Sequence, residues 1–219
     1  MKTMKMTLTV LCTLIMTVTA WSQESTIKAQ LQQHPDDPDL LLRAGEYYLQ
    51  AAGRGDAGAA GKSESYLSKL LGLEPRNGRA MACYGSLLTI KARDAGRQQE
   101  QIKYMQRGLA KLDKAVILCP DDPFIRMTRG STYSNIPAFF NRLDTAVKDF
   151  EHVVTLQKKS DMHLPLDFWA PFHLAYGYAL VKKNDPEGAA LQYKTLITKA
   201  PEHPLAEQAK ELLDQLELE

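Results

Sequence analysis

The chain has 219 residues, with 27 Lys and Arg against 26 Asp and Glu and a formal net charge of +1 at pH 7. A charge this close to neutrality offers no strongly basic surface, so we expect neither nucleic acid nor anionic lipid as a partner. The length suits one compact domain or one short solenoid.

The first 22 residues, MKTMKMTLTVLCTLIMTVTAWS, are typical of a secretory signal peptide. Lys2 and Lys5 precede an uncharged apolar run over residues 6–20, which is short for a helix that spans a bilayer. Cleavage after Ala20 or after Ser22 fits the small-residue rule, and we favour Ser22. Loss of this segment removes two lysines and no acidic residue, which leaves a formal net charge of −1. We expect a periplasmic or secreted protein with no integral membrane segment after signal cleavage.

A repeated pattern fills most of the remaining sequence. Two segments 85 residues apart align without a gap, PDDPDLLLRAGEYY from Pro35 and PDDPFIRMTRGSTY from Pro120. Each of four units has a Gly with Tyr or Leu three residues later, then a small residue with Leu or an aromatic four residues later. The first motifs are Gly45/Tyr48, Gly85/Leu88, Gly130/Tyr133 and Gly177/Leu180, and the second are Ser63/Leu67, Gly108/Leu112, Ala146/Phe150 and Ala189/Tyr193.

This pattern resembles the tetratricopeptide repeat (TPR) between about Pro35 and Pro201, although Arg126 and Arg129 replace apolar letters in the third unit. The resemblance implies an all-α protein, a right-handed α-solenoid of about four helix hairpins. The small residues let the two helices of a unit approach closely, and the large residues fill the space beside them. We expect the array over residues 38–203, with units at about 38–77, 78–122, 123–158 and 170–203.

Capping helices are expected at both ends of the array, because stacked hairpins share their apolar faces and leave each end open. Ile27 and Leu31 lie four residues apart in the expected N-terminal capping helix, residues 23–37. The expected C-terminal capping helix, residues 204–219, has apolar residues at spacings of three and four against a charged face.

The units differ in the gap between their first and second motifs, which is 15, 20, 13 and 9 residues in chain order. The last gap is the standard TPR spacing, so the first three units have extra residues at their hairpin tips. In a solenoid the tips share one edge, and insertions there often mark a working surface. The second insertion is helix-forming around a turn at Asp94-Ala95-Gly96 and predicts a protruding hairpin.

The first insertion contains GRGDAGAAGKS, residues 53–63, which at first sight matches a phosphate-binding loop. That loop needs a glycine five residues before Gly61, where this chain has Asp56, and it follows a β-strand. Here the preceding residues have helical periodicity. We therefore interpret the stretch as a spacer between two helices.

The third insertion contains Pro137, where a helix would stall, followed by the hairpin-tip residues Phe139 and Phe140. Two adjacent aromatic residues do not face the same side of a helix. Either one packs under the hairpin while the other meets a partner, or both pack internally.

No catalytic or metal-binding motif is present in the sequence. The five histidines form no His-Glu-x-x-His arrangement, and no Gly-x-Ser-x-Gly elbow occurs. We expect no enzyme activity, no metal site and no cofactor, and we expect His173 to be a packed core residue. Cys83 and Cys119 are either a disulfide or two free thiols.

The inner surface of the first helices is the face with which the resemblance implies that the protein binds a partner. The residues expected to line this partner-binding groove are Leu42, Glu46, Leu49, Ser86, Met127, Ser131, Leu174 and Tyr178. They are chiefly apolar or hydroxylated, which suits an amphipathic helix or a hydrophobic extended segment.

The sequence thus predicts a non-enzymatic protein–protein interaction scaffold or adaptor of the bacterial envelope. Its partner is expected to be a protein or peptide, such as a transport or envelope-assembly component. The alternative is a ligand carrier or enzyme accessory subunit that uses a cleft near residues 135–142 and 157–168. Self-association into a homo-oligomer through the groove is a third hypothesis.

Overall fold

A computed structural model describes residues 23–159 and 163–217, so the expected signal peptide lies outside the described residues. The described chain is helical. A first helix covers residues 23–33 and is followed by α2 (Pro38–Gly53), α3 (Ala59–Leu73), α4 (Gly78–Asp94), α5 (Gln98–Leu118), α6 (Pro123–Asn135), the 3-10 helix η1 (Ala138–Phe140), α7 (Leu143–Lys159), α8 (Leu166–Lys182), α9 (Pro186–Lys199) and α10 (Leu205–Glu217).

The repeated Pro-Asp-Asp-Pro sequence lies at the N-terminus of two of these helices. Its second aspartate is the N-cap, and its second proline lies in the first turn. Asp37 caps α2, where its Oδ1 accepts a hydrogen bond of 2.9 Å from the Leu40 N–H, and Pro38 lies in the first turn. Asp122 and Pro123 repeat this arrangement at α6. Proline fits the first turn because the N–H that it lacks would have no helical partner there.

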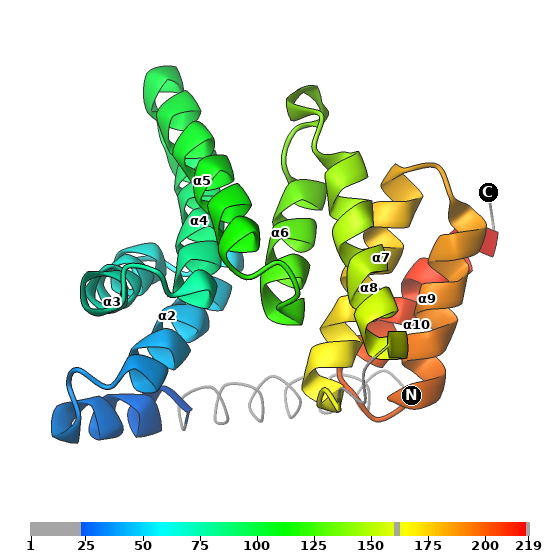
Figure 1. Cartoon of the computed structure of the whole chain (residues 1–219). Coiled ribbons are helices and arrows are strands. Elements are labelled where there is room, and N and C mark those ends of the chain that lie inside the picture. The colour runs from blue at the N-terminus through cyan, green and yellow to red at the C-terminus, as the bar shows by residue number, and fades with distance from the viewer. Residues whose placement is uncertain (1–22, 160–162, 218–219) are drawn as a thin grey trace, which may run out of the picture.

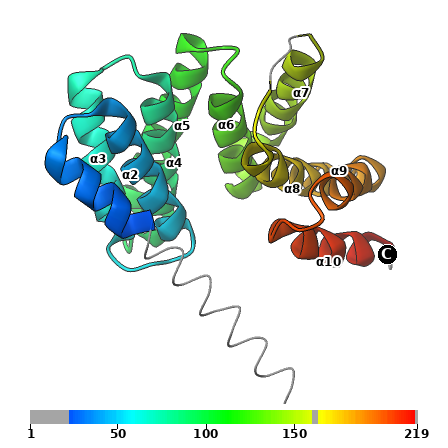
Figure 2. The same cartoon turned by 90° about the horizontal axis from the view of Figure 1, so that it is seen from below.

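The helices pair into four hairpins that stack in chain order (Figure 1). Within the hairpins, α2 contacts α3, α4 contacts α5, α6 contacts α7, and α8 contacts α9. The first helices contact one another in the order α2, α4, α6, α8, and each second helix also contacts the first helix of the next hairpin. Figure 2 shows the N-terminal helices at one end of the stack and α10 at the other. The predicted all-α solenoid is confirmed.

Close approach within each hairpin depends on the predicted glycines. A Cβ atom on Gly45 would lie 2.5 Å from Leu67 Cδ2, and one on Gly177 would lie 2.3 Å from Tyr193 Cε1. Both distances are far below van der Waals contact, so no larger residue fits without displacing its neighbour. The other two units repeat the arrangement, with Gly85 against Leu112 and Gly130 against Phe150. The predicted close approach of the two helices at these glycines is confirmed.

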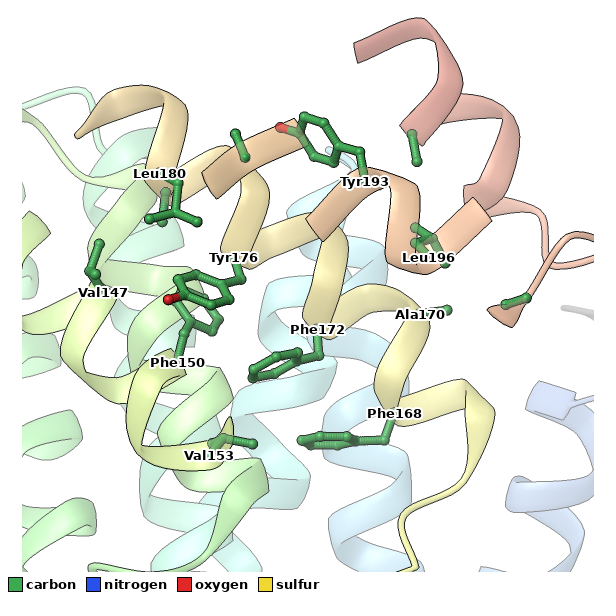
Figure 3. Packing of buried hydrophobic residues seen from close by; sticks show 14 residues of the cluster. Val147, Phe150, Val153, Phe168, Ala170, Phe172, Tyr176, Leu180, Tyr193 and Leu196 are labelled. Carbon is green, nitrogen blue, oxygen red and sulfur yellow. The ribbon is translucent and has the colours of Figure 1, made fainter. Parts of the chain in front are cut away.

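Aromatic side chains fill the core between α7 and α8 (Figure 3). The Phe150 ring of α7 stacks on Tyr176 of α8, with centroids 5.2 Å apart, and meets Phe172 edge-on at 5.5 Å. Phe168 stacks on Phe172 one turn away, at 5.8 Å. Because these four residues are buried and come from two hairpins, the third and fourth units share one core.

Three expected boundaries differ from the structure. The N-terminal helix ends at residue 33 instead of 37, because Pro35 cannot continue it and Asp37 caps the next helix. The helix α7 continues to Lys159, and α8 begins at Leu166 instead of residue 170, with Pro165 at its N-cap. The connector between them is therefore shorter than expected, and its residues 160–162 lie outside the described part.

In the described ranges, residues 23–159 and 163–217, no helix has both the length and the apolar character needed to cross a membrane.

Candidate functional site

The hairpin of α4 and α5 is longer than the hairpin that follows it, and the difference in length opens a groove. The helix α5 has 21 residues, whereas α6 has 13 and ends at Asn135. The chain then passes through Pro137 and η1 before α7 begins, because proline cannot continue the helix. The tip of the third unit is therefore not α-helical (Figure 1). It lines one groove together with residues of α4 and α5.

We call the space between these two tips the tip groove. It has a volume of about 1040 Å³. Its lining comes from α4, α5, α6 and the segment around η1, together with the end of α2. The lining residues are Gly53, Ser86, Thr89, Ile90, Ala92, Arg93, Gln98, Gln101, Ile102, Met105, Ser131, Thr132, Asn135, Ile136, Pro137, Phe139 and Phe140.

Apolar side chains from α5 and from η1 form two walls of the tip groove. Ile102 and Met105 come from α5, and Phe139 and Phe140 come from η1. Phe140 packs against the core of the second and third units, whereas Phe139 is 74% exposed and Ile102 is 48% exposed. Large apolar residues exposed together on a concave surface are typical of a binding site.

The floor of the tip groove carries hydroxyl groups that tie α4 to α6. The hydroxyl groups of Ser86 and Thr132 share a hydrogen bond of 3.0 Å between the two helices. Thr89 Oγ1 donates to the Ser86 carbonyl at 2.8 Å, within α4. Because these hydroxyls are held by neighbouring protein groups, the floor is fixed in position before a partner binds.

Arg93 is the one charged side chain among the described residues that line the tip groove. Its guanidinium donates to the two Asp94 carboxylate oxygens at 2.6 and 3.1 Å. It also donates to the carbonyls of Ala52 and Gly53 at the end of α2, at 3.2 and 3.4 Å. The guanidinium therefore already has anionic and carbonyl partners, and the groove offers a bound segment little net charge.

Of the eight residues predicted to line the partner-binding groove, only Ser86 and Ser131 line the tip groove. The predicted hairpin-tip residues Phe139 and Phe140 also line it. The other six lie elsewhere along the first helices. Leu42 and Leu49 pack against the N-terminal core, and Met127 and Leu174 pack against the core of the last two units. Glu46 is half-buried, and Tyr178 is 37% exposed under the ammonium of Lys182.

Glu46 contacts the second unit through a thiol. The Cys83 thiol donates to Glu46 Oε1 at 3.9 Å, and burial raises the pKa of the Glu46 carboxyl. Cys83 and Cys119 are free thiols, so the disulfide alternative is not what the structure shows.

His173 packs against Trp169, with ring centroids 5.8 Å apart, and its Nδ1 lies 2.9 Å from Gln192 Oε1.

Ile102, Met105 and Ile136 belong to the tip groove but were not among the predicted site residues. A signal for the first two was present, because a helical insertion that protrudes beyond its neighbour must expose one face of its second helix. Their spacing of three residues places them on that same face.

The cleft proposed near residues 135–142 and 157–168 is a wrong prediction. Residues 135–140 do line a groove, but they face α4 and α5, and no described residue of 157–168 lines it. The helix α7 separates the two segments because it runs over 17 residues from the hairpin tip to the connector, a length of roughly 25 Å.

The stretch at residues 53–63 is a turn followed by the first residues of α3, as the spacer interpretation predicts. It follows the helix α2 and not a β-strand. Gly55 and Gly58 have φ angles of 90° and 76°, which residues with a side chain rarely adopt. The glycines therefore serve the turn between two helices.

Neither protein-family models nor curated proteins match this sequence. The structure, however, resembles a thermophilic TPR protein of Thermus thermophilus, with a TM-score of 0.68 over 89% of each chain and 16% sequence identity. The chain has a tetratricopeptide-repeat fold. The predicted resemblance to TPR proteins is thus confirmed in three dimensions.

A second structural match is the Cut9–Hcn1 hetero-tetramer of the APC/C. It has a TM-score of 0.42 and 18% identity, and the alignment covers 90% of this chain and 39% of that chain.

Proposed function

We propose that this TPR-fold protein is a non-enzymatic scaffold that binds a segment of a partner protein in the tip groove. The observation that carries the proposal is the pair of exposed apolar walls, Ile102 on α5 and Phe139 on η1, facing one groove of about 1040 Å³. Covering these walls removes apolar surface from water, which drives association. The fixed hydroxyl floor supports the same conclusion, because a preorganised site loses little conformational entropy on binding.

The direct test replaces Ile102 by Asp and compares it with Ile117→Asp. Both isoleucines lie on α5 and are exposed, at 48% and 78%, but only Ile102 lines the tip groove. A buried, unpaired carboxylate on one wall should abolish partner capture. Affinity capture from an extract of the producing cells should recover a partner with wild type and with Ile117→Asp but lose it with Ile102→Asp. Equal capture by all three proteins would remove the tip groove from the proposal.

We also propose that the protein acts in the bacterial envelope, as a periplasmic or secreted adaptor for a transport or envelope-assembly component. The support is the signal-peptide pattern of the first 22 residues, with its charged start and short apolar run. Intact-mass measurement of the protein from its native compartment should then give a chain that begins at Gln23. An uncleaved chain that starts at residue 1 would contradict export by this signal.

A further inference from the structure

Side-chain amides from two helices line the tip groove. Gln98 and Gln101 come from α5, and Asn135 comes from the end of α6. The Gln101 Nε2 donates to the Ala95 carbonyl at 2.7 Å, and the Asn135 Nδ2 donates to the Ser131 carbonyl at 2.8 Å. Each of these bonds orients an amide and leaves its oxygen with acceptor capacity, since an amide oxygen has two lone pairs.

One face of α5 carries both the amides and the apolar wall. Gln98, Gln101, Ile102 and Met105 are spaced by three, four and seven residues from the first, which places them on the same side of a helix. The amides lie toward the hairpin tip, and Ile102 and Met105 follow them toward the base. A segment that enters between α5 and η1 therefore meets amide groups and apolar side chains along one wall.

The conformation of a bound segment decides whether those amides are useful. An α-helix satisfies its own backbone N–H and C=O groups, apart from those at its ends. An extended segment has unsatisfied donors and acceptors along its main chain and places alternate side chains on opposite faces. Amides beside apolar walls complement the second arrangement, because they bond to the main chain while the walls take up side chains.

The charges in the groove restrict the side chains of the segment. No carboxylate is present among the described residues that line the tip groove, and Arg93 is already bound to Asp94. A charged side chain on the partner would lose water without gaining an opposite charge, which is unfavourable.

We infer that the tip groove binds its partner as an extended, uncharged segment, with the side-chain amides of Gln98, Gln101 and Asn135 bonded to the main chain and the apolar walls covering alternate side chains. This inference rests on the proposed function and specifies the class of partner for the same site.

The experiment selects from a displayed library of random 12-residue peptides on the wild-type protein, with Ile102→Asp as the counter-selection. Enriched peptides should have apolar residues at alternate positions and should lack Asp, Glu, Lys and Arg. The best peptide is then synthesised with single N-methyl groups on its backbone amides. Methylation at a bonded amide should weaken binding roughly five- to tenfold, the usual effect of one hydrogen bond.

A pair of variants locates that hydrogen bond. Gln101→Met removes the amide from the groove at similar length and should weaken the parent peptide by a similar factor. In this variant the penalty for methylation of the amide that Gln101 binds should disappear. Gln106→Met is the matched control, because Gln106 lies on α5, is exposed and does not line the tip groove; its affinity should equal that of the wild type.

The outcomes separate the inference from the proposed function. Enriched peptides with apolar residues three and four apart, or affinities insensitive to methylation, would overturn the extended conformation and leave peptide binding in place. An acidic or basic consensus would overturn the uncharged class. If no peptide is enriched on the wild type over Ile102→Asp, both the inference and the peptide-binding groove fail.

Discussion

At the scale of single residues, Arg126 and Arg129, which replace apolar residues of the repeat in the third unit, belong to a buried ion cluster. Asp149 of α7 is fully buried, and its carboxylate accepts hydrogen bonds of 2.7–2.8 Å from Arg126 and Arg129 of α6. Arg129 also donates to Asp113 of α5 at 3.0 Å. The cluster therefore fixes α6, which carries part of the tip groove, to the helices on both sides.

Asp149→Ala should destabilise the protein strongly. It leaves Arg126 and Arg129, whose side chains are 16% and 12% exposed, without their shared anion. Removing one partner of a buried ion pair costs roughly 3–5 kcal/mol of unfolding free energy. Asp144→Ala on the same helix is the matched control and should cost far less, because its ion pair with Lys183 is exposed to solvent. Chemical denaturation measures both losses, and similar values would contradict the structural role of the cluster.

At the scale of helices, the hairpin interior follows simple packing rules that the repeat makes visible. A glycine on the first helix faces a large residue on the second, and this pairing recurs in all four units. The pairing sets how closely the two helices lie, and the large residue in each unit is buried.

Substitution of two glycines by alanine should change stability in opposite directions. Gly177→Ala places a Cβ atom 2.3 Å from the fully buried ring of Tyr193, and such overpacking costs about 1–3 kcal/mol. Gly61→Ala in α3 meets no atom within 4 Å, so the better helix propensity of alanine should stabilise by about 0.5–1 kcal/mol. Thermal unfolding of both variants tests this, and a stabilised Gly177→Ala would contradict the close approach of α8 and α9.

At the scale of the whole molecule, the described array has a helix over each end and a groove between two of its tips. Ile27 and Leu31 of the first helix are buried against the N-terminal core. At the other end, α10 contacts both α8 and α9, with Ala206 and Ala209 buried. Both ends of the described array are therefore covered by a helix.

Uncovering the C-terminal end should cause association. Ala209→Glu puts a carboxylate at a site with 0% exposure, which should undock α10 and expose the core beneath it. Gln208→Glu is the matched control, because it adds the same charge on the exposed side of the same helix. Gel filtration over a range of concentrations should show larger species for Ala209→Glu and wild-type behaviour for Gln208→Glu. Unchanged elution of Ala209→Glu would show that α10 is not needed as a cap.

Local spacings and the repeated pattern in the amino-acid sequence were enough to predict several features of the fold. The helix starts after Asp37 and Asp122 and the spacer at residues 53–63 follow from spacings of a few residues, and the close approach at Gly45 and Gly177 follows from the repeated pattern. These features were predictable because helix geometry converts a short spacing into a fixed position in space.

The position of the tip groove and the set of residues that line it depend on the packing of whole hairpins. Ile102 and Phe139 line the same groove because one hairpin is longer than the next and because the chain leaves the helix at Pro137, and neither fact predicts the path of residues 136–142. Arg126 and Asp149 lie on the two helices of one hairpin, but no repeated spacing marks them as partners. Such contacts depend on how whole helices stack, and stacking is set by the summed packing of many side chains rather than by any local spacing.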